Sequence, residues 1–428
     1  MNVITTIFRA GELAHPKQKV LNWLQRFSTF SFLDNHSYPS RPGSEEILAA
    51  GGARARFDLR IADPSAFQSL DTFINTHQGQ WIFGHLGFAC GSEPGSVKRN
   101  TDRGFGDCFF FVPDVLVRLD ATELVITADD PQQVFKDIDA CSGTIATSGH
   151  PPPNVLSRLS REEYLDTIDK LRQHILRGDC YEINFCQEFY AEDSVVDPLA
   201  MYHRLAALSP APFAAFYRVD DQWLACSSPE RYLRKQGSQV ISQPIKGTLK
   251  RDPLAMQPDD EAQARVLYNS AKDRSENVMI VDLVRNDLSR FCIEGSVKVD
   301  ELYGVYVFPQ VYQMISTISG EVDPGIPLGR MLADSFPMGS MTGAPKRRVT
   351  ELITEYEVSA RGLYSGTVGY IRPDGDFDFN VVIRSILYDS TARYLSLPAG
   401  SGITFYSDPS LEWEECLIKA AAMRRALG

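Results

Sequence analysis

The segment Pro244-Ile245-Lys246-Gly247-Thr248 places a lysine where its amine could attack a substrate. A lysine between an isoleucine and a glycine is more often a solvated surface charge. This one ends the strand predicted from the run 240–245 and precedes a Gly-Thr turn, where a side chain can point into a cleft. An unperturbed lysine, with a pKa of about 10.4, is almost wholly protonated at neutral pH. Lys246 is therefore a nucleophile only if its pKa is lowered or a base takes its proton, and Glu230 is the candidate base.

Two pairs of carboxylates stand three residues apart, Asp273 with Glu276 and Glu412 with Glu415. On a helix each pair shares one face, where like charges repel by roughly a few tenths of a kcal/mol. Taken alone, each pair is more often a solvated acidic face, here balanced by neighbouring basic residues. Taken together, the two pairs suit a hard cation that prefers oxygen ligands and keeps several waters, which describes Mg²⁺.

Two glycine-rich segments could bring backbone N–H groups close to an anion. The first, 336–346, precedes a predicted helix, and it lacks the spacing of the phosphate-binding loops of nucleotide hydrolases. The second, 399–402, is expected to be a loop of small residues that allows close approach of a carboxylate. On composition alone, an ordinary connector explains the first segment about equally well.

The elements that must position these residues combine helices with antiparallel strands. Ser160 and Glu163 form a predicted capping box for a helix that Gly178 ends. Further helices are predicted at 259–288 (a pair) and 411–427, and strands at 81–84, 108–113, 115–119, 124–127, 364–371, 379–388 and 393–397. The order predicts an α+β fold, a large two-lobed unit of antiparallel sheets flanked by helices.

A connector rich in Gly, Ser and Pro (142–157) predicts the main boundary of the chain. The chain of 428 residues exceeds the usual size of one domain, so two units are expected, 1–150 and 158–424. We find no catalytic motif before residue 150.

Composition excludes several classes of protein. The balance of 43 basic and 55 acidic residues, a net charge of −12, argues against nucleic-acid binding. No run approaches the roughly 18–20 apolar residues of a membrane span, and the N-terminus does not resemble a signal peptide. The eight cysteines are scattered, as in a reduced cytoplasmic protein. No histidine follows His203, so no glutaminase elbow with a downstream histidine is present.

Together these segments, in this order, resemble the chorismate-utilising enzymes, a family that includes anthranilate, isochorismate and salicylate synthases. The resemblance covers residues 158–424, and residues 1–150 are only loosely similar to the N-terminal region of anthranilate synthase component I. Family members of those three activities have alanine in the Pro-Ile-x-Gly-Thr block, whereas those that aminate chorismate at C4 have lysine, as here at Lys246. The resemblance thus implies conversion of chorismate and ammonia to 4-amino-4-deoxychorismate, on the route to p-aminobenzoate and folate.

The resemblance also implies a role for each site residue. Lys246 attacks C2 of the ring and Glu230 helps the C4 hydroxyl to leave. Glu276 and Glu415 bind Mg²⁺, with Asp273 and Glu412 nearby through water. The substrate and its carboxylates are held by Tyr364, Thr248, Arg384, Gly400, Gly402 and Lys419.

Two positions depart from the family pattern. Glu182 stands where the ammonia users often have glutamine and the water-adding members have a lysine base, and Gln313 stands where many relatives have histidine. Loss of that histidine fits an enzyme that keeps the pyruvyl group. The resemblance implies that ammonia comes from a separate glutamine amidotransferase subunit. Two alternatives stay open: another chorismate enzyme, chiefly anthranilate synthase, and a non-catalytic relative.

Overall fold

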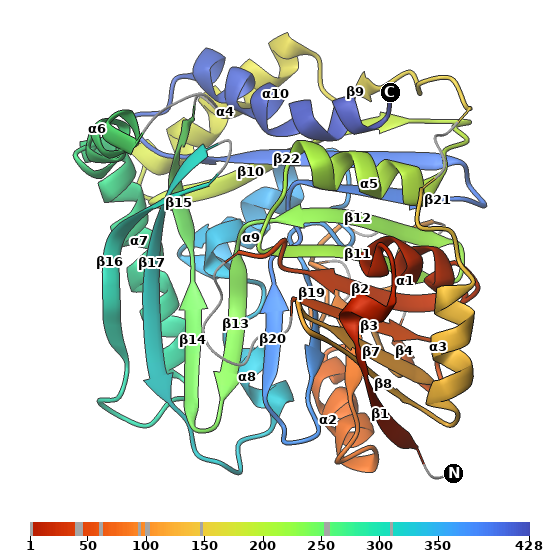
Figure 1. The fold of residues 1–428 in the computed structure, drawn as a ribbon. Coiled ribbons are helices and arrows are strands. Elements are labelled where there is room, and N and C mark those ends of the chain that lie inside the picture. The colour runs from red at the N-terminus through yellow and green to blue at the C-terminus, as the bar shows by residue number, and fades with distance from the viewer. Residues whose placement is uncertain are drawn as a thin grey trace.

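A computed structural model describes residues 3–38, 46–59, 63–92, 96–98, 103–145, 149–251, 257–308 and 311–428. Within these residues the chain forms two antiparallel sheets flanked by helices (Figure 1). This confirms the predicted α+β class. Residues 146–148 of the predicted connector lie outside the described part.

The first sheet contains strands from both ends of the chain. Its order is β1 (Ile4–Arg9), β8 (Glu123–Ala128), β7 (Val115–Leu119), β3 (Ile47–Gly51), β2 (Thr29–Asp34), β11 (Phe213–Val219), β12 (Gln222–Ser228), β21 (Ser385–Asp389), β22 (Tyr394–Ile403), β10 (Glu182–Ala191) and β18 (Gly343–Ala344), with β9 (Leu156–Ser157) paired to β10. The predicted hairpin of 115–119 and 124–127 is confirmed as β7 and β8.

The second sheet is built in the same way. Its order is β15 (Ile245–Lys250), β17 (Val311–Glu321), β14 (Gln239–Gln243), β13 (Arg231–Gln236), β20 (Phe377–Asn380), β19 (Thr367–Ile371), β5 (Ile82–Leu86), β6 (Cys108–Val112) and β4 (Ala55–Leu59), with β16 (Lys298–Val307) paired to β17. In Figure 1, β10, β12 and β22 run across the view while β14, β13 and β20 run up it, so the sheets cross steeply.

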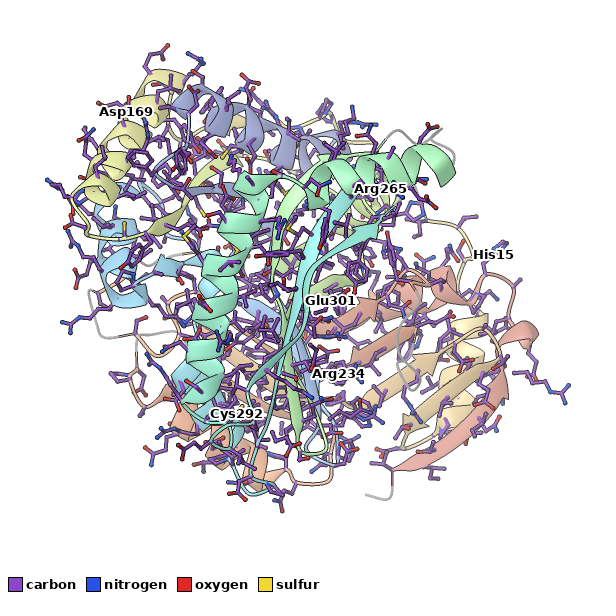
Figure 2. All side chains as sticks on the ribbon, turned by 90° about the vertical axis from the view of Figure 1, so that its left-hand side faces the viewer. His15, Asp169, Arg234, Arg265, Cys292 and Glu301 are labelled. Atoms are coloured by element: carbon purple, nitrogen blue, oxygen red, sulfur yellow. The ribbon has the colours of Figure 1, made fainter. Side chains whose placement is uncertain are left out.

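Helices cover the outer faces of both sheets. They are α1 (Pro16–Leu24), α2 (Ala66–Thr76), α3 (Pro131–Asp139), α4 (Arg161–Leu176), α5 (Pro198–Leu208), α6 (Gln257–Tyr268), α7 (Ala271–Ser289), α8 (Leu328–Ser335), α9 (Lys346–Tyr356) and α10 (Pro409–Ala426), with short 3-10 turns η1 (Ala10–Glu12) and η2 (Gly339–Met341). The Ser160–Glu163 capping box of α4 is confirmed, as is the helix pair α6 and α7. Figure 2 faces α7, which ends just before Cys292 and lies beside the long strand β16 that carries Glu301.

The buried core lies between the sheets and beneath the helices. Phe83, Phe111 and Tyr217 belong to one cluster that joins strands of both sheets. Because these strands come from before and after residue 150, the two predicted units share both sheets. We propose that residues 1–150 and 158–424 fold together; their division stays a prediction of the sequence.

One predicted strand, 379–388, is wrong. Its residues form β20 in the second sheet and β21 in the first, and the chain crosses between the sheets at residues 381–384. Arg384 has a left-handed backbone there, with φ of 50°. A continuous apolar pattern cannot reveal such a crossing, because residues on both sides of it are buried in one sheet or the other.

Candidate active site

Lys246 and Glu182 form the buried ion pair at the meeting point of the two sheets. The Nζ atom of Lys246 on β15 lies 2.5 Å from Oε1 of Glu182, the first residue of β10. The two side chains are 10% and 2% exposed. The alternative interpretation of Lys246 as a solvated surface charge is therefore wrong.

The local backbone explains how Lys246 reaches this position. The prediction that it ends a strand before a turn is wrong: Pro244 separates β14 from β15, and Lys246 is the second residue of β15. The pairing of β15 with β17 is irregular between Ile245 and Thr248, and Gly247 has φ of +90°. Glycine adopts this conformation without a steric cost, which favours a bulge that re-aims the neighbouring side chain.

The carboxylates around Lys246 favour the protonated form of its amine. Burial acts to lower the pKa of Lys246, but the carboxylates of Glu182, Glu276 and Glu230 together raise it above its ordinary value. Of the two routes by which Lys246 could become a nucleophile, a raised pKa disfavours the first, and transfer of its proton to a neighbouring base is left. Among the described residues Glu182 forms the one ion pair with Lys246, so it is the base in contact with the amine.

Glu230 lies in the turn between β12 and β13 and is 4% exposed. Burial raises its pKa to about 7, although a hydrogen bond from Ser340 and the charge of Lys246 act in the other direction. A carboxyl group with this pKa is partly protonated at neutral pH and can donate a proton to a leaving group. Ser340 belongs to η2, so the glycine-rich segment 336–346 contributes to the site through a side chain.

The two acidic pairs meet across Lys272. Its Nζ lies 3.8 Å from Oε1 of Glu276 on α7 and 3.9 Å from Oε1 of Glu412 on α10. Burial raises the pKa of both carboxyl groups, that of Glu276 to about 7. Oε1 of Glu276 and Oε2 of Glu412 are buried without a hydrogen-bond partner. Buried oxygens of this kind are costly unless a cation or a donor satisfies them.

The other member of each pair is placed differently. Asp273 packs against Gly247, where an added Cβ would lie 3.1 Å from its Oδ1. Glu415 is 43% exposed and forms a 2.7 Å ion pair with Lys419, which lowers the pKa of Glu415. Among the described residues no group of three His, Cys, Asp or Glu side chains forms a ready-made metal centre.

Gly400 and Gly402 lie on a strand, so the prediction of a loop at 399–402 is wrong. They pair with Cys186 and Asn184 of β10 inside β22. Close approach is nevertheless present: a Cβ at Gly402 would lie 2.7 Å from Oε1 of Glu182. The carbonyl oxygen of Gly400 accepts a 2.8 Å hydrogen bond from Lys419.

A small open hollow lies beside Pro229, the residue before Glu230. Pro229, Gln313 and Arg384 line it with Ser209, Pro210, Ala211, Phe308 and Val311. Burial lowers the pKa of Arg384, whereas the charge of Glu230 raises it. Gln313 is 1% exposed, and its Oε1 has no hydrogen-bond partner. A guanidinium and an amide on one wall can bind a carboxylate.

The two remaining predicted residues lie at different depths, Tyr364 in the core and Thr248 at the surface. Tyr364 is buried, with its hydroxyl 3.9 Å from Sγ of Cys186. Thr248 pairs with Gln313 across β15 and β17, and its side chain is exposed.

Sequence reasoning missed Lys272 and Ser340 and left Glu182 without a role. Lys272 precedes Glu276 by one helical turn, and that spacing could have indicated the ion pair. Contact between Ser340 and Glu230 depends on the fold and has no signal in the sequence.

Comparison with known proteins defines the class. The model of the chorismate binding enzyme family matches residues 35–425, and the chain belongs to this family. Two solved structures share the fold: anthranilate synthase component I from Streptococcus pneumoniae TIGR4 (TM-score 0.78, 23% identity, 91% of this chain and 94% of that one) and the menaquinone-specific isochorismate synthase MenF from Escherichia coli (TM-score 0.79, 18% identity, 100% and 94%).

Relatives of higher identity carry one name. The chain is 38% identical over 271 residues to aminodeoxychorismate synthase component 1 of Escherichia coli strain K12, a match that covers 63% of this chain and 59% of the relative. Its counterpart in Salmonella typhimurium is 39% identical (61% and 57%), and that in Bacillus subtilis is 35% identical (63% and 56%). The chain thus covers less than two thirds of the length of these relatives. No helix in the described part of the chain is long and apolar enough to cross a membrane.

Proposed function

We propose that this chain is an aminodeoxychorismate synthase component 1, which converts chorismate and ammonia to 4-amino-4-deoxychorismate for p-aminobenzoate and folate synthesis. The observation that carries the proposal is the buried Lys246 at the position that separates amination at C4 from the other activities in the resemblance. The names of the relatives support the same activity.

The reaction needs a nucleophile and an acid on the two ends of a conjugated system. The neutral amine of Lys246 forms a bond to C2, the ring double bonds shift, and the C4–oxygen bond breaks. Glu230, with a pKa of about 7, gives its proton to the departing oxygen, which leaves as water. Ammonia then attacks C4, the double bonds shift back, and the bond between C2 and Lys246 breaks.

The residues at the meeting of α7 and α10 fit Mg²⁺. Glu276 and Glu412 each offer a buried carboxylate oxygen without a hydrogen-bond partner, and Asp273 and Glu415 stand one turn away on the same helices. Oxygen donors of this kind suit a hard divalent cation. When bound, the cation would neutralise the ring carboxylate of chorismate and polarise the ring.

Cations and backbone groups around the hollow would hold the substrate carboxylates. Arg384 lines the hollow, and Lys419 lies beside Gly400 on β22. We propose that these residues, with the amide of Gly402, bind the enolpyruvyl group. Tyr364 would support β10 through its contact with Cys186, and Thr248 would lie at the exposed edge of the substrate site.

Ammonia is proposed to come from a separate glutamine amidotransferase. The name "component 1" of the relatives implies a second component in those proteins. The sequence of this chain has no histidine after His203 to serve a glutaminase elbow.

The test is to incubate the pure protein with chorismate, Mg²⁺ and an ammonium salt and to identify the product by mass. The expected product retains the pyruvyl group and carries an amine in place of one hydroxyl. Formation of anthranilate, isochorismate or salicylate, or no turnover, would contradict the proposal.

A further inference from the structure

Glu182 is built to interact with one group, the amine of Lys246. Its Oε1 lies 2.5 Å from Nζ of Lys246, whereas its Oε2 is buried without a hydrogen-bond partner. Glu182 is 1% exposed and is the first residue of β10. It pairs with Ala344 on one side, and its neighbour Ile183 pairs with Ile403 on the other, so its backbone is fixed from both sides. The carboxylate therefore has little freedom to move away from Lys246.

The surroundings of Lys246 are acidic on every side. Glu182 faces it from β10, Glu276 from α7, Glu230 from the β12–β13 turn and Glu415 from α10. Two further cations, Lys272 and Lys419, are each paired with a carboxylate of the site. The 2.5 Å ion pair with Glu182 holds the amine of Lys246 in its protonated form, and a protonated amine has no lone pair with which to attack.

We propose that Glu182 is the general base that takes the proton of Lys246 when the amine attacks chorismate. This role rests on the function proposed above. One N–H bond of the ammonium breaks, its electron pair stays on nitrogen, and the proton moves to the Glu182 carboxylate. The freed pair forms the bond to C2. When ammonia displaces Lys246 from C2, the proton returns from Glu182 to the departing amine.

Geometry distinguishes Glu182 from Glu230 for this role. Direct proton transfer requires hydrogen-bond contact, roughly 3.2 Å or less between the heavy atoms, and among the described residues only Glu182 makes such a contact with Lys246. Glu230 is held by a hydrogen bond from Ser340 and has a pKa suited to the opposite task, donation of a proton. Two carboxyl groups thus divide the acid and base roles of one step.

The proposal predicts a difference in pH dependence. In the wild type the proton passes within the pair, so formation of the covalent adduct does not need a free amine in advance. In Glu182→Gln the amine must lose its proton to solvent, and its reactive fraction rises about tenfold per pH unit below its pKa. Glu230 is present in both proteins and its pKa is not set by Glu182, so its titration cancels in the ratio of the two rates.

The experiment mixes each protein with chorismate and Mg²⁺ without ammonia, quenches at short times, and measures the adduct by intact-protein mass. Over about pH 5.5 to about pH 8 we expect the ratio of wild-type to Glu182→Gln rates to fall close to tenfold per pH unit. Glu188→Gln is the matched control, since Glu188 is a buried glutamate of the same strand paired with Arg158, and it should leave the ratio flat.

A ratio for Glu182→Gln that stays constant with pH would show that Glu182 only positions Lys246, and would overturn the proposal. Glu182→Asp keeps a carboxylate and serves if Glu182→Gln fails to fold: its adduct should form more slowly with the pH dependence of the wild type. A steep dependence in Glu182→Asp would also overturn it. If the wild type makes aminated product without any adduct, Lys246 is not the nucleophile and Glu182 is not its base. The proposed overall reaction would still stand in that case.

Discussion

Gly402 lies directly against Glu182. A Cβ at residue 402 would stand 2.7 Å from Oε1 of Glu182 and 2.8 Å from Nζ of Lys246, closer than carbon atoms approach these groups in folded proteins. The absence of a side chain at residue 402 of β22 is therefore a condition for the ion pair between Glu182 on β10 and Lys246 on β15. Gly402, which the sequence predicted to bind substrate, thus also shapes the ion pair of Glu182 and Lys246.

We expect Gly402→Ala to lower kcat/KM for chorismate at least about tenfold, because the methyl group would displace one partner by several tenths of an ångström. The fold should survive, since the displaced atoms are the ends of long side chains. Gly11→Ala is the control, because an added Cβ there meets nothing within 4 Å. Unchanged kinetics in Gly402→Ala would show that the pair tolerates the methyl group.

Replacement of Glu276 or Glu412 by glutamine should weaken Mg²⁺ binding at least about tenfold, since each supplies a buried oxygen without a hydrogen-bond partner. Glu415→Gln should have a smaller effect, because Glu415 is half-exposed and already paired with Lys419. The measurement is the rise in unfolding temperature on titration with Mg²⁺, which reports binding without turnover. An equal shift in all three variants and the wild type would place the cation elsewhere.

Glu230 should make stability depend on pH. Because burial raises its folded pKa to about 7 from an ordinary 4.5, the folded state holds the proton more tightly, and its stability falls as pH rises between these values. Glu230→Gln should therefore be more stable than the wild type at about pH 8, by up to about 3 kcal/mol, with little difference below about pH 4.5. Urea unfolding at both pH values measures this. A constant difference would contradict the raised pKa.

The same carboxyl group should set the alkaline limit of activity. Since the protonated form donates to the leaving hydroxyl, kcat/KM should decline above about pH 7, and Glu230→Gln should lose about 10²-fold or more. The measurement is a pH–rate profile of both proteins with chorismate, saturating Mg²⁺ and a constant concentration of unprotonated ammonia. Full activity of Glu230→Gln would assign the acid to another group.

Glutamine alone should not support turnover by this chain, whereas ammonium at alkaline pH should, because only unprotonated ammonia attacks C4. Product formation is compared with glutamine, with ammonium, and with glutamine plus a glutaminase subunit. Turnover with glutamine in the absence of a second protein would contradict the proposed partner.

Local signals predicted the elements well where residues near in sequence decide the structure. The capping box of Ser160 and Glu163 and the β7–β8 hairpin are of this kind. The errors at 379–388 and 399–402 have a different origin. Gly400 and Gly402 are strand residues because β10, some two hundred residues earlier, pairs with them, and no short window contains that information.

In the candidate site, too, features set by neighbouring residues were predicted and contacts between distant elements were not. Helical spacing predicted that the two acidic pairs each share a face, but the contact of Lys272 with both Glu276 and Glu412 exists because α7 and α10 meet in space. Lys246 was identified from its motif, whereas its protonation depends on carboxylates from separate elements. The sequence thus indicated candidate residues, and the fold determined which charged side chains lie in contact.

The most direct measurement asks whether Lys246 is the covalent nucleophile. The wild type, mixed with chorismate and Mg²⁺ and quenched, should gain the mass of chorismate less one water, and peptide mapping should place it on Lys246. Lys246→Ala should lose the adduct and react more slowly, with residual activity from direct attack by ammonia. Lys272→Ala, which removes the neighbouring half-exposed lysine, should keep the adduct. An adduct that persists in Lys246→Ala, or that maps to another residue, would contradict the mechanism.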